Sequence, residues 1–349
     1  MSYTLDSAIH GHAFAWGAPT VTGRLRSSPE DFQVTELPLV EPSGEGEHAW
    51  LLVEKRLENT ETVARQLARC AGVPVRQVSY AGMKDRNAVT EQWFSVHLPG
   101  RPDPDWNAVN SDTVTLIQYT RHGRKLRRGA LTGNAFRLRV RAVAGDRSAL
   151  EDQLQQVAEH GVPNYFGEQR FGRDAGNLHT ADRLFAGMAG KLTRHRRGLA
   201  LSAARSFLFN RVLAQRVDDS SWDHAIPGDA LQLAGSHSFF VAEAVDPELE
   251  RRVLSMDVHP TGPLAGAGEP PVSGAVRRLE ERCLAEQQAW CSGLAKAGLR
   301  QERRALRLPV TELAWTWPQP DCLELTFSLT AGAYATSVLR ELVTECRVP

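Results

Sequence analysis

Asp85 has an unusual charge setting. It lies three positions after Gly82 and directly between two cations, Lys84 and Arg86. An exposed aspartate has a pKa near ~3.9, and the flanking cations are expected to keep it ionised. An ionised carboxylate can attack an electrophilic carbon, including the anomeric carbon of a sugar, and Lys84 and Arg86 could contact phosphates beside it. The pattern alone also allows a simple turn, because aspartate near glycine commonly forms one.

A second segment could bind a base next to such a carboxylate. Gly133-Asn134-Ala135-Phe136 is predicted to be a loop that leads into a strand. An amide such as that of Asn134 can read a base edge, and a ring such as that of Phe136 can stack on a base. Phe32 and Tyr334 are further aromatic candidates. The alternative is an ordinary loop amide and aromatic rings that belong to the core.

Positive charge gathers near these segments, although the formal net charge is zero. The zero balance argues against a protein that coats nucleic acid non-specifically. The strand predicted from Phe136 alternates apolar residues with Arg137, Arg139 and Arg141, so one face is expected to be buried and the other to carry only guanidinium groups. Basic runs are often only solvated surface, but these flank the candidate loops. The candidate ligands of an RNA backbone are Arg86, Arg124, Lys125, Arg127, Arg137 and Arg139.

Several classes of protein are disfavoured by composition. The five cysteines form no Cys-x-x-Cys pair, so neither a disulfide framework nor a cysteine zinc site is expected. No apolar run approaches the ~20 residues that span a bilayer, and the N-terminus lacks the pattern of a signal peptide. Neither a P-loop nor a dinucleotide fingerprint is present. The sequence therefore predicts a cytoplasmic protein without metal or membrane contact.

The order of predicted elements indicates an α+β protein in which one domain is inserted into another. Strands are predicted at both ends of the chain, with a helix from about Asn59 to Gly72 near the start. The middle of the chain is predicted to be largely helical, with residues 274–297 forming one helix. The segment 260–271, rich in Gly and Pro, is predicted to be a long loop. The predicted insertion covers about 160–307.

The residues around Asp85 resemble the signature segment of the TruD family of tRNA pseudouridine synthases. That segment is 81–92, Ala-Gly-Met-Lys-Asp-Arg-Asn-Ala-Val-Thr-Glu-Gln. Other segments resemble the family in the family's own order, so the resemblance covers nearly the whole chain. They are Pro29–Phe32, Gly44–His48, Gly133–Phe136, Asn164–Gly172 and Gly332–Glu341.

The resemblance implies a pseudouridine synthase catalytic domain with a mixed, mostly antiparallel sheet and helices. This domain would be discontinuous, formed by residues 1–159 and 308–349. Residues 160–307 would form the insertion that is specific to the family, in agreement with the boundaries expected from the pattern of elements.

The resemblance also implies roles for individual residues. Asp85 would be the nucleophile, and Phe32, Asn134 and an aromatic residue near the C-terminus would contact the target nucleotide. That aromatic residue is commonly Phe in the family and is Tyr334 here. Two neighbours of these residues are further candidates for substrate binding, namely Lys84 and Phe136.

The implied reaction is the isomerisation of uridine 13 in the tRNA D-arm to pseudouridine. It breaks the N1–C1′ bond, turns the base and joins C5 to C1′, so no cofactor and no metal is expected. The base must leave its stack to be reached. Attack of Asp85 at C1′, attack at C6 and a glycal route all remain open. The partner is tRNA, and the protein is expected to be a monomer.

Two other functions are open on the residues alone. The arginine stripe would also suit an RNA-binding or tRNA-folding module that performs no chemistry. Asp85 and Glu91 could instead be the two carboxylates of a nucleoside or glycoside hydrolase. Pseudouridine in treated tRNA would exclude the first alternative, and release of free base or sugar would indicate the second.

Overall fold

The structure is a computed structural model that describes residues 12–346 and divides into two compact units. Unit 1 contains the described residues up to Pro19 together with Ala149–Pro309 and Ala333–Leu342. Unit 2 contains Thr20–Ser148, Val310–Gly332 and the described residues from Val343 onward. The predicted insertion, 160–307, lies within unit 1. Unit 1 also contains segments that the sequence prediction assigned to the catalytic domain.

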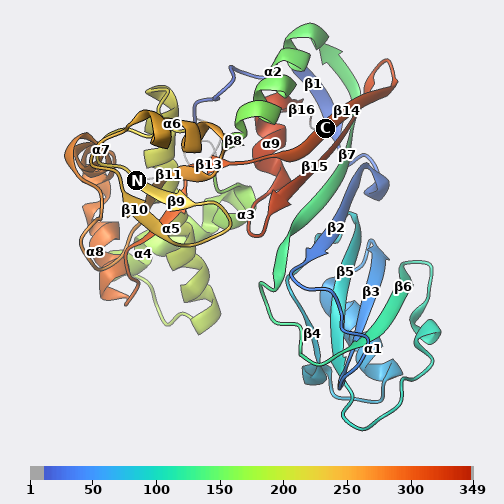
Figure 1. The fold of residues 1–349 in the computed structure, drawn as a ribbon. Helices are drawn as coiled ribbons and strands as arrows, with labels where there is room; N and C mark the ends of the chain where they lie inside the picture. Colours follow the sequence, from blue (N-terminus) through green and yellow to red (C-terminus); the bar gives the residue numbers. More distant parts are fainter. Residues whose placement is uncertain (1–11, 347–349) are drawn as a thin grey trace. The chain divides into compact units, whose positions relative to one another are not determined.

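Unit 2 is built on one ten-stranded sheet. Its strands are β1 (Val21–Leu25), β2 (Phe32–Pro38), β3 (His48–Arg56), β4 (Val78–Tyr80), β5 (Val89–His97), β6 (Val114–His122), β7 (Leu131–Gly145), β14 (Thr311–Gln319), β15 (Cys322–Thr330) and β16 (Thr344–Glu345). The main path of the sheet is β14-β15-β7-β2-β5-β3-β6 (Figure 1). Among the described strands of this sheet, the β2–β5 and β1–β16 pairs are parallel and the others antiparallel, which confirms the expected mixed, mostly antiparallel sheet.

Strand β7 is the longest strand of this sheet and pairs with β15 on one side and with β2 and β1 on the other. The prediction that Gly133–Phe136 forms a loop was wrong, because these residues lie inside β7. Asn134 pairs with Glu36 on β2 and with Leu329 on β15. A Cβ atom at Gly133 would lie 2.2 Å from the carbonyl oxygen of Leu329. This glycine therefore permits a close approach of two strands, and it does not mark a turn.

One helix, α1 (Thr60–Cys70), covers part of the sheet, close to its predicted position. Its apolar face carries Val63, Leu67 and Ala68, which are almost fully buried. These side chains join a core cluster that also contains Leu51 of β3 and Phe94 of β5. The first residue of α1, Thr60, is thereby held against the sheet beside the segment that joins β4 to β5.

Unit 1 is helix-rich and carries a smaller sheet of order β10-β9-β11-β12 and a two-stranded β13-β8 pair. Its helices are α2 (Arg147–His160, which begins in unit 2), α3 (Glu168–Phe171), α4 (Gly176–Phe185), α5 (Arg194–Asp218), α6 (Pro247–Leu254), α7 (Gly274–Leu284), α8 (Gln288–Lys296) and α9 (Ala335–Leu342). Its strands are β8 (Val162–Pro163), β9 (Ala230–Leu233), β10 (Phe239–Val241), β11 (Val258–Leu264), β12 (Glu302–Ala305) and β13 (Arg307–Leu308). Short 3-10 turns in the two units span Pro29–Asp31, Val75–Gln77, Trp106–Val109, Arg173–Ala175 and Ala285–Gln287.

Two sequence predictions in unit 1 were wrong. The first part of the predicted loop 260–271, up to Leu264, belongs to β11, which contains Pro260 and Pro263, whereas residues 265–271 lie outside any helix or named strand. This strand pairs with β9 along its first half and with β12 along its second half, so each proline interrupts fewer hydrogen bonds than it would in a strand paired along both edges. The predicted helix 274–297 is interrupted by a 3-10 turn, although no proline or glycine lies at the break.

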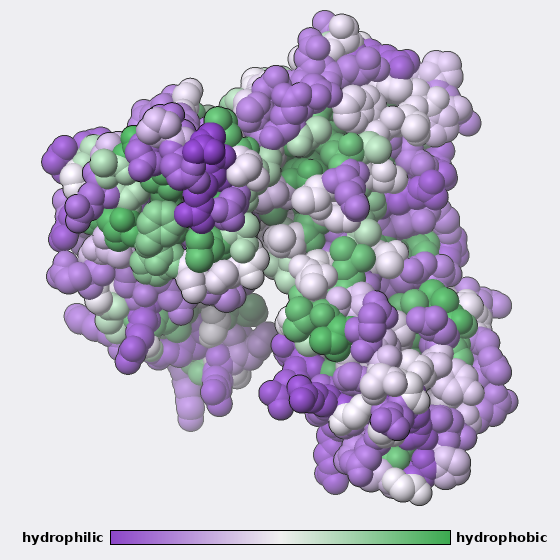
Figure 2. Space-filling view, viewed as in Figure 1, coloured by the Kyte–Doolittle hydropathy of each residue, from purple (hydrophilic) through white to green (hydrophobic). Residues whose placement is uncertain are grey.

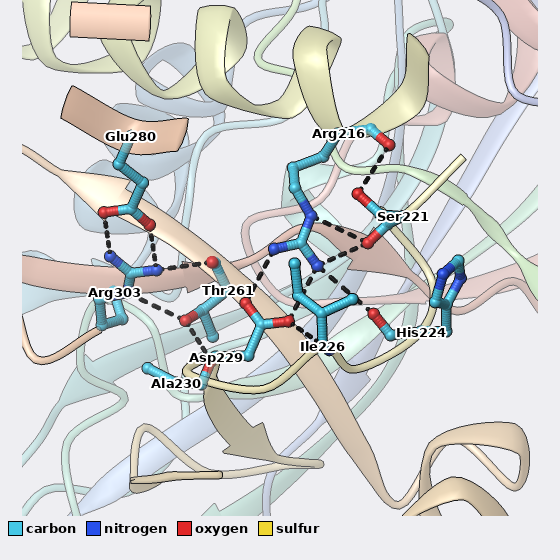
Figure 3. A network of polar contacts seen from close by, with 9 residues as sticks. All are labelled: Arg216, Ser221, His224, Ile226, Asp229, Ala230, Thr261, Glu280 and Arg303. Carbon is cyan, nitrogen blue, oxygen red and sulfur yellow. Dashed lines mark hydrogen bonds and ion pairs between the residues drawn. The ribbon is translucent and has the colours of Figure 1, made fainter. Parts of the chain in front are cut away.

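Two buried arginine–carboxylate pairs lie in the interior of unit 1 (Figure 3). Arg216 of α5 contacts both carboxylate oxygens of Asp229, at 2.8 and 2.9 Å, and donates to the carbonyl of Ser221. Arg303 of β12 makes a similar two-point contact with Glu280 of α7, at 2.7 and 3.0 Å. Bidentate pairs of this kind hold α5 and α7 in fixed positions against the strands.

Hydrophilic residues cover much of the face of the molecule shown in Figure 2, and hydrophobic residues form smaller patches between them. Within residues 12–346, the structure contains no helix that is both long enough and apolar enough to cross a membrane.

Removal of the charge of Arg216 is expected to destabilise the protein strongly. Arg216→Met leaves Asp229 buried without its partner, so the free energy of unfolding should fall by about 3–5 kcal/mol. Arg211→Met on the same helix removes only an exposed pair with Glu286 and should cost less than about 1 kcal/mol. Urea denaturation of the full chain measures the free energy of unfolding of both variants. Equal decreases in the two variants would contradict the prediction that loss of the buried Arg216–Asp229 pair is the more destabilising change.

Candidate active site

Asp85 lies in the segment that joins β4 to β5, and contacts from four other elements hold the backbone of this segment. Two of the contacts involve side chains of the sheet, one comes from the start of α1, and one comes from the loop before β7. They are Gly129 N to Ala81 O (2.8 Å), Gln92 Nε2 to Gly82 O (2.5 Å), Lys84 N to Thr60 Oγ1 (3.1 Å) and Lys55 Nζ to Asp85 O (2.6 Å). None of these four contacts, which hold the backbone of the segment, uses the Asp85 carboxylate.

The carboxylate of Asp85 remains partly accessible, with 28% of its side chain exposed. Its Oδ2 atom lies 3.0 Å from Nη1 of Arg26, and its Oδ1 atom accepts a hydrogen bond from the backbone N–H of Asn87 at 3.2 Å. Arg26 was not predicted from the sequence. Its position shortly before the Pro29–Phe32 segment was the only available signal, and its backbone lies in the left-handed region with φ of 53°.

Arg26 connects Asp85 to the first aromatic candidate. Its guanidinium carbon lies 4.1 Å from the centroid of the Phe32 ring. Phe32 makes an edge contact with Phe136, which in turn stacks on Phe327 at 5.3 Å. Phe32 and Phe136 are only 6% and 8% exposed. Both rings are thus part of the core, and Phe32 also lies beneath the Arg26 guanidinium that contacts the Asp85 carboxylate.

Asn134 reaches Asp85's neighbour in the chain, Lys84. The Lys84 ammonium lies 2.5 Å from Oδ1 of Asn134 and 3.0 Å from Oε2 of Glu36, and its side chain is only 8% exposed. Burial raises the pKa of Glu36, and the Lys84 cation works against that shift. The structure therefore directs this ammonium to two protein groups and leaves it little access to a phosphate. Glu36 was not predicted as a member of the site.

Lys55 is a second buried cation that the sequence analysis did not identify. It is 1% exposed and donates to the backbone carbonyl of Asp85. Burial lowers its pKa to about 8, while the nearby Asp85 and Glu58 carboxylates partly oppose the shift. The alternation of β3 places Lys55 on the buried face of the strand. A lysine at a position where an apolar residue is expected was the sequence signal that could have identified it.

The basic loop before β7 packs against the Asp85 segment. Leu126 is buried in a cluster with Ala81, Trp50 and Trp93, and the N–H of Leu126 donates to Ser95 Oγ at 3.0 Å. The cations on either side of this anchor are exposed, and no carboxylate in the described part of the chain lies within ion-pair distance of them. They are Arg124, Lys125 and Arg127.

The guanidinium face predicted for β7 is partly neutralised. Arg137 and Arg139 both pair with Glu324 of β15, at 3.0 and 2.7 Å, and Arg141 makes a bidentate contact with Asp31. The prediction of a face that carries only positive charge was therefore wrong, because the neighbouring strand and turn supply carboxylates. The other predicted backbone ligand, Arg86, is exposed and donates to the carbonyl of Leu57.

Tyr334 belongs to unit 1, where it lies immediately before α9. Its hydroxyl oxygen accepts a hydrogen bond from Nη2 of Arg170 at 3.3 Å. Arg304 lies in the same environment, and burial lowers its pKa to about 10. The groups that the structure brings together in unit 2 are therefore Asp85, Lys84, Asn134 and Phe32. Within residues 12–346, His, Cys, Asp and Glu form no cluster of three that could hold a metal ion.

Comparisons with known proteins agree on one family. The family model described as tRNA pseudouridine synthase D (TruD) matches residues 8–187 and 177–342. The tRNA pseudouridine synthase D of Nitrosococcus oceani is 53% identical over 95% of this chain and 93% of its own length. That of Methylococcus capsulatus is 50% identical over 94% and 93%. The crystal structure of a Methanosarcina mazei protein assigned to tRNA pseudouridine synthase D superposes with a TM-score of 0.76 at 21% identity, over 97% of each chain, which shows a shared fold.

The buried Lys55 predicts a dependence of stability on pH. The folded protein loses the Lys55 proton near pH 8 and the unfolded chain near 10.5, so the unfolded state binds more protons between these values. The stability of the wild type should therefore rise across this window relative to Lys55→Met, by up to about 3 kcal/mol. Urea denaturation of both proteins from pH 7 to 10.5 measures the difference, and a constant difference would show that the pKa of Lys55 is not lowered.

Proposed function

The chain belongs to the TruD family of tRNA pseudouridine synthases, and on this premise we propose that Asp85 is the nucleophile with which it converts uridine 13 of the tRNA D-arm to pseudouridine. Membership makes the protein an isomerase that acts on tRNA, and the proposal names the nucleotide and the reacting group. The observation that carries it is the accessible Asp85 carboxylate, paired with Arg26 at 3.0 Å on a segment whose backbone is held from four sides.

The reaction needs a group that holds the ribose or the base while the glycosidic bond is broken. The N1–C1′ bond breaks, the base turns, and C5 bonds to C1′. C5 then loses its proton and N1 gains one, so the number of atoms does not change. Attack at C1′, attack at C6 and a glycal route all place the carboxylate next to the target nucleotide. Because this reaction is redox-neutral and transfers no group to another molecule, we propose that it uses no cofactor and no metal.

The contacts of Phe32 suggest how the flipped base is received. The planar Arg26 guanidinium already lies on the Phe32 ring, so a base that stacks there takes the place of the guanidinium. Stacking of a base on an aromatic ring contributes about 1–3 kcal/mol, similar to the cost of extracting the base. Tyr334 is proposed as the second aromatic contact and Asn134 as the amide that binds the base. In the core, Phe136 positions Phe32.

The exposed cations support binding of the tRNA backbone close to Asp85. Arg124, Lys125 and Arg127 flank the buried Leu126, which packs against Ala81 in the Asp85 segment. Phosphate contacts of this kind orient the RNA without reading its sequence. Arg86, Arg137 and Arg139 are proposed as more distant contacts. We also propose that the protein acts as a monomer in the cytoplasm.

The hydrolase alternative is disfavoured by the geometry of β5. Successive side chains of a strand point to opposite faces. Gln92 points toward the Asp85 segment, because its amide donates to the carbonyl of Gly82. Glu91 therefore points to the other face, where its carboxylate accepts a hydrogen bond from Thr35 at 3.2 Å. A second carboxylate from this position would not face the bond that Asp85 attacks.

Loss of the Asp85 carboxylate should abolish the reaction. Asp85→Ala and Asp85→Asn are expected to lower pseudouridine formation by at least about 1,000-fold, because no other group supplies the nucleophile. Asp112→Ala, at an exposed position of unit 2, is the matched control and should retain activity. The measurement is mapping of pseudouridine at position 13 in unmodified tRNA. Substantial activity of folded Asp85→Ala would exclude the proposed role.

The two groups of cations should differ in how they affect the salt dependence of tRNA binding. Removal of the three unpaired charges in Arg124→Ala/Lys125→Ala/Arg127→Ala should reduce the slope of log K against log salt by up to about 2. Arg137→Ala/Arg139→Ala should have a smaller effect, since Glu324 already neutralises part of their charge. Binding titrations at several salt concentrations give the slopes. A larger effect of the β7 pair would mean that the arginine stripe is the principal RNA contact.

A further inference from the structure

The side-chain amide of Asn134 is held in one orientation by a buried cation. Lys84 Nζ lies 2.5 Å from one atom of this amide, and a lysine ammonium has three donors and no acceptor. The atom that faces Lys84 must therefore be the oxygen, Oδ1, whatever assignment is given to the two ends of the amide. The remaining end, Nδ2, can only donate hydrogen bonds.

Glu36 makes this arrangement stable. It is the cross-strand partner of Asn134 in the β2–β7 pair, it is 2% exposed, and its Oε2 lies 3.0 Å from the Lys84 ammonium. The carboxylate thus holds the ammonium against Asn134 from the neighbouring strand. Turning the amide by 180° would set two donors, Nδ2 and Nζ, against each other in a buried place, which is strongly disfavoured.

The donor end of Asn134 is open to a ligand. Nδ2 has no hydrogen-bond partner among residues 12–346. It is also not among the buried polar atoms without a partner, so it remains accessible to solvent. The amide is linked to the segment that carries Asp85, because its Oδ1 atom contacts the ammonium of Lys84, which directly precedes Asp85 in the chain. A substrate that occupies the site would therefore meet an amide that offers hydrogen-bond donors only.

We propose that the Glu36–Lys84 pair is a positioning device that keeps Asn134 as a fixed donor to a carbonyl group of the target uracil, both before and after the base turns. This inference rests on the proposed function of the site. A turn of uracil about the axis through N3 and C6 exchanges N1 with C5, as the reaction requires, and it also exchanges O2 with O4. The same donor therefore meets a carbonyl oxygen in both orientations.

This arrangement also discriminates between uracil and cytosine. Cytosine has a carbonyl at C2 and an amino group at C4, so a turn about the same axis brings its amino group to the place of the carbonyl. A donor would then face a donor in one of the two orientations. An amide that was free to rotate would accept the amino group through Oδ1. The Lys84 contact thus favours a base that has two carbonyls.

The test compares tRNA substrates that carry uridine, 2-thiouridine or 4-thiouridine at position 13. A thiocarbonyl is a weak acceptor, so each thio substitution should lower kcat/KM of the wild type about 3- to 10-fold. In Lys84→Met, kcat/KM for ordinary tRNA should fall about 10-fold or more, and both thio effects should shrink toward 1. The thio effect of the wild type is divided by the thio effect of Lys84→Met for the same substrate. This ratio cancels the difference in intrinsic reactivity between the thio base and uracil.

Two further variants keep the experiment decisive. If Lys84→Met folds poorly, the double variant Glu36→Gln/Lys84→Met takes its place, because it leaves no unpaired buried charge. It should show the same loss of the thio effects. Lys296→Met removes an exposed lysine of unit 1 and should leave all ratios as in the wild type. Lower activity of Lys84→Met with unchanged thio effects would mean that Lys84 has a merely structural role. That result would overturn this inference and leave the proposed function intact. A wild type that forms no pseudouridine would overturn the proposed function as well.

Discussion

The contact between Lys84, Glu36 and Asn134 is the interaction on which the site of unit 2 depends. It links the segment of Asp85 to two adjacent strands, β2 and β7, through a single ammonium group that is almost excluded from water. Burial of two opposite charges gives little net stability, because the loss of hydration offsets most of their attraction. The main consequence of the Lys84–Glu36 pair is geometric. Any position of the Asp85 segment that separates the two charges would leave each of them unpaired inside the sheet, so the segment has one favourable position.

The long strand β7 explains why such distant residues meet. It pairs with β2 and β1 along one edge and with β15 along the other, so residues from three parts of the chain share one surface. Its alternation places Asn134 and Phe136 on the same face, toward Lys84 and Phe32. The opposite face carries Arg137 and Arg139, whose charge Glu324 reduces. One strand thus separates the groups that are proposed to bind or position the base from those that are proposed to meet the RNA backbone.

The sequence predicted much of this arrangement, and its errors have physical reasons. The β7 strand and the α1 helix followed from clear periodicity. Gly133 was taken as part of a loop, because glycine is a turn signal in a single sequence, whereas here it allows β15 to approach. Arg26, Glu36 and Lys55 were missed because each acts through a partner that lies far away in the chain. The register of the sheet decides which residues pair across strands, as Glu36 and Asn134 do. Local sequence patterns do not specify this register.

The contacts around Asp85 are divided between its backbone and its carboxylate in a way that suits a nucleophile. The neutral and cationic donors Gln92 and Lys55 bind main-chain carbonyls of the segment and fix its path. Among residues 12–346, the carboxylate has a single charged partner, Arg26, whose own side chain is one-third exposed. A nucleophile held by buried partners would have to break those contacts in order to react. Here the buried contacts are made by other atoms, so the carboxylate can exchange Arg26 for a substrate while the segment that carries it stays in place.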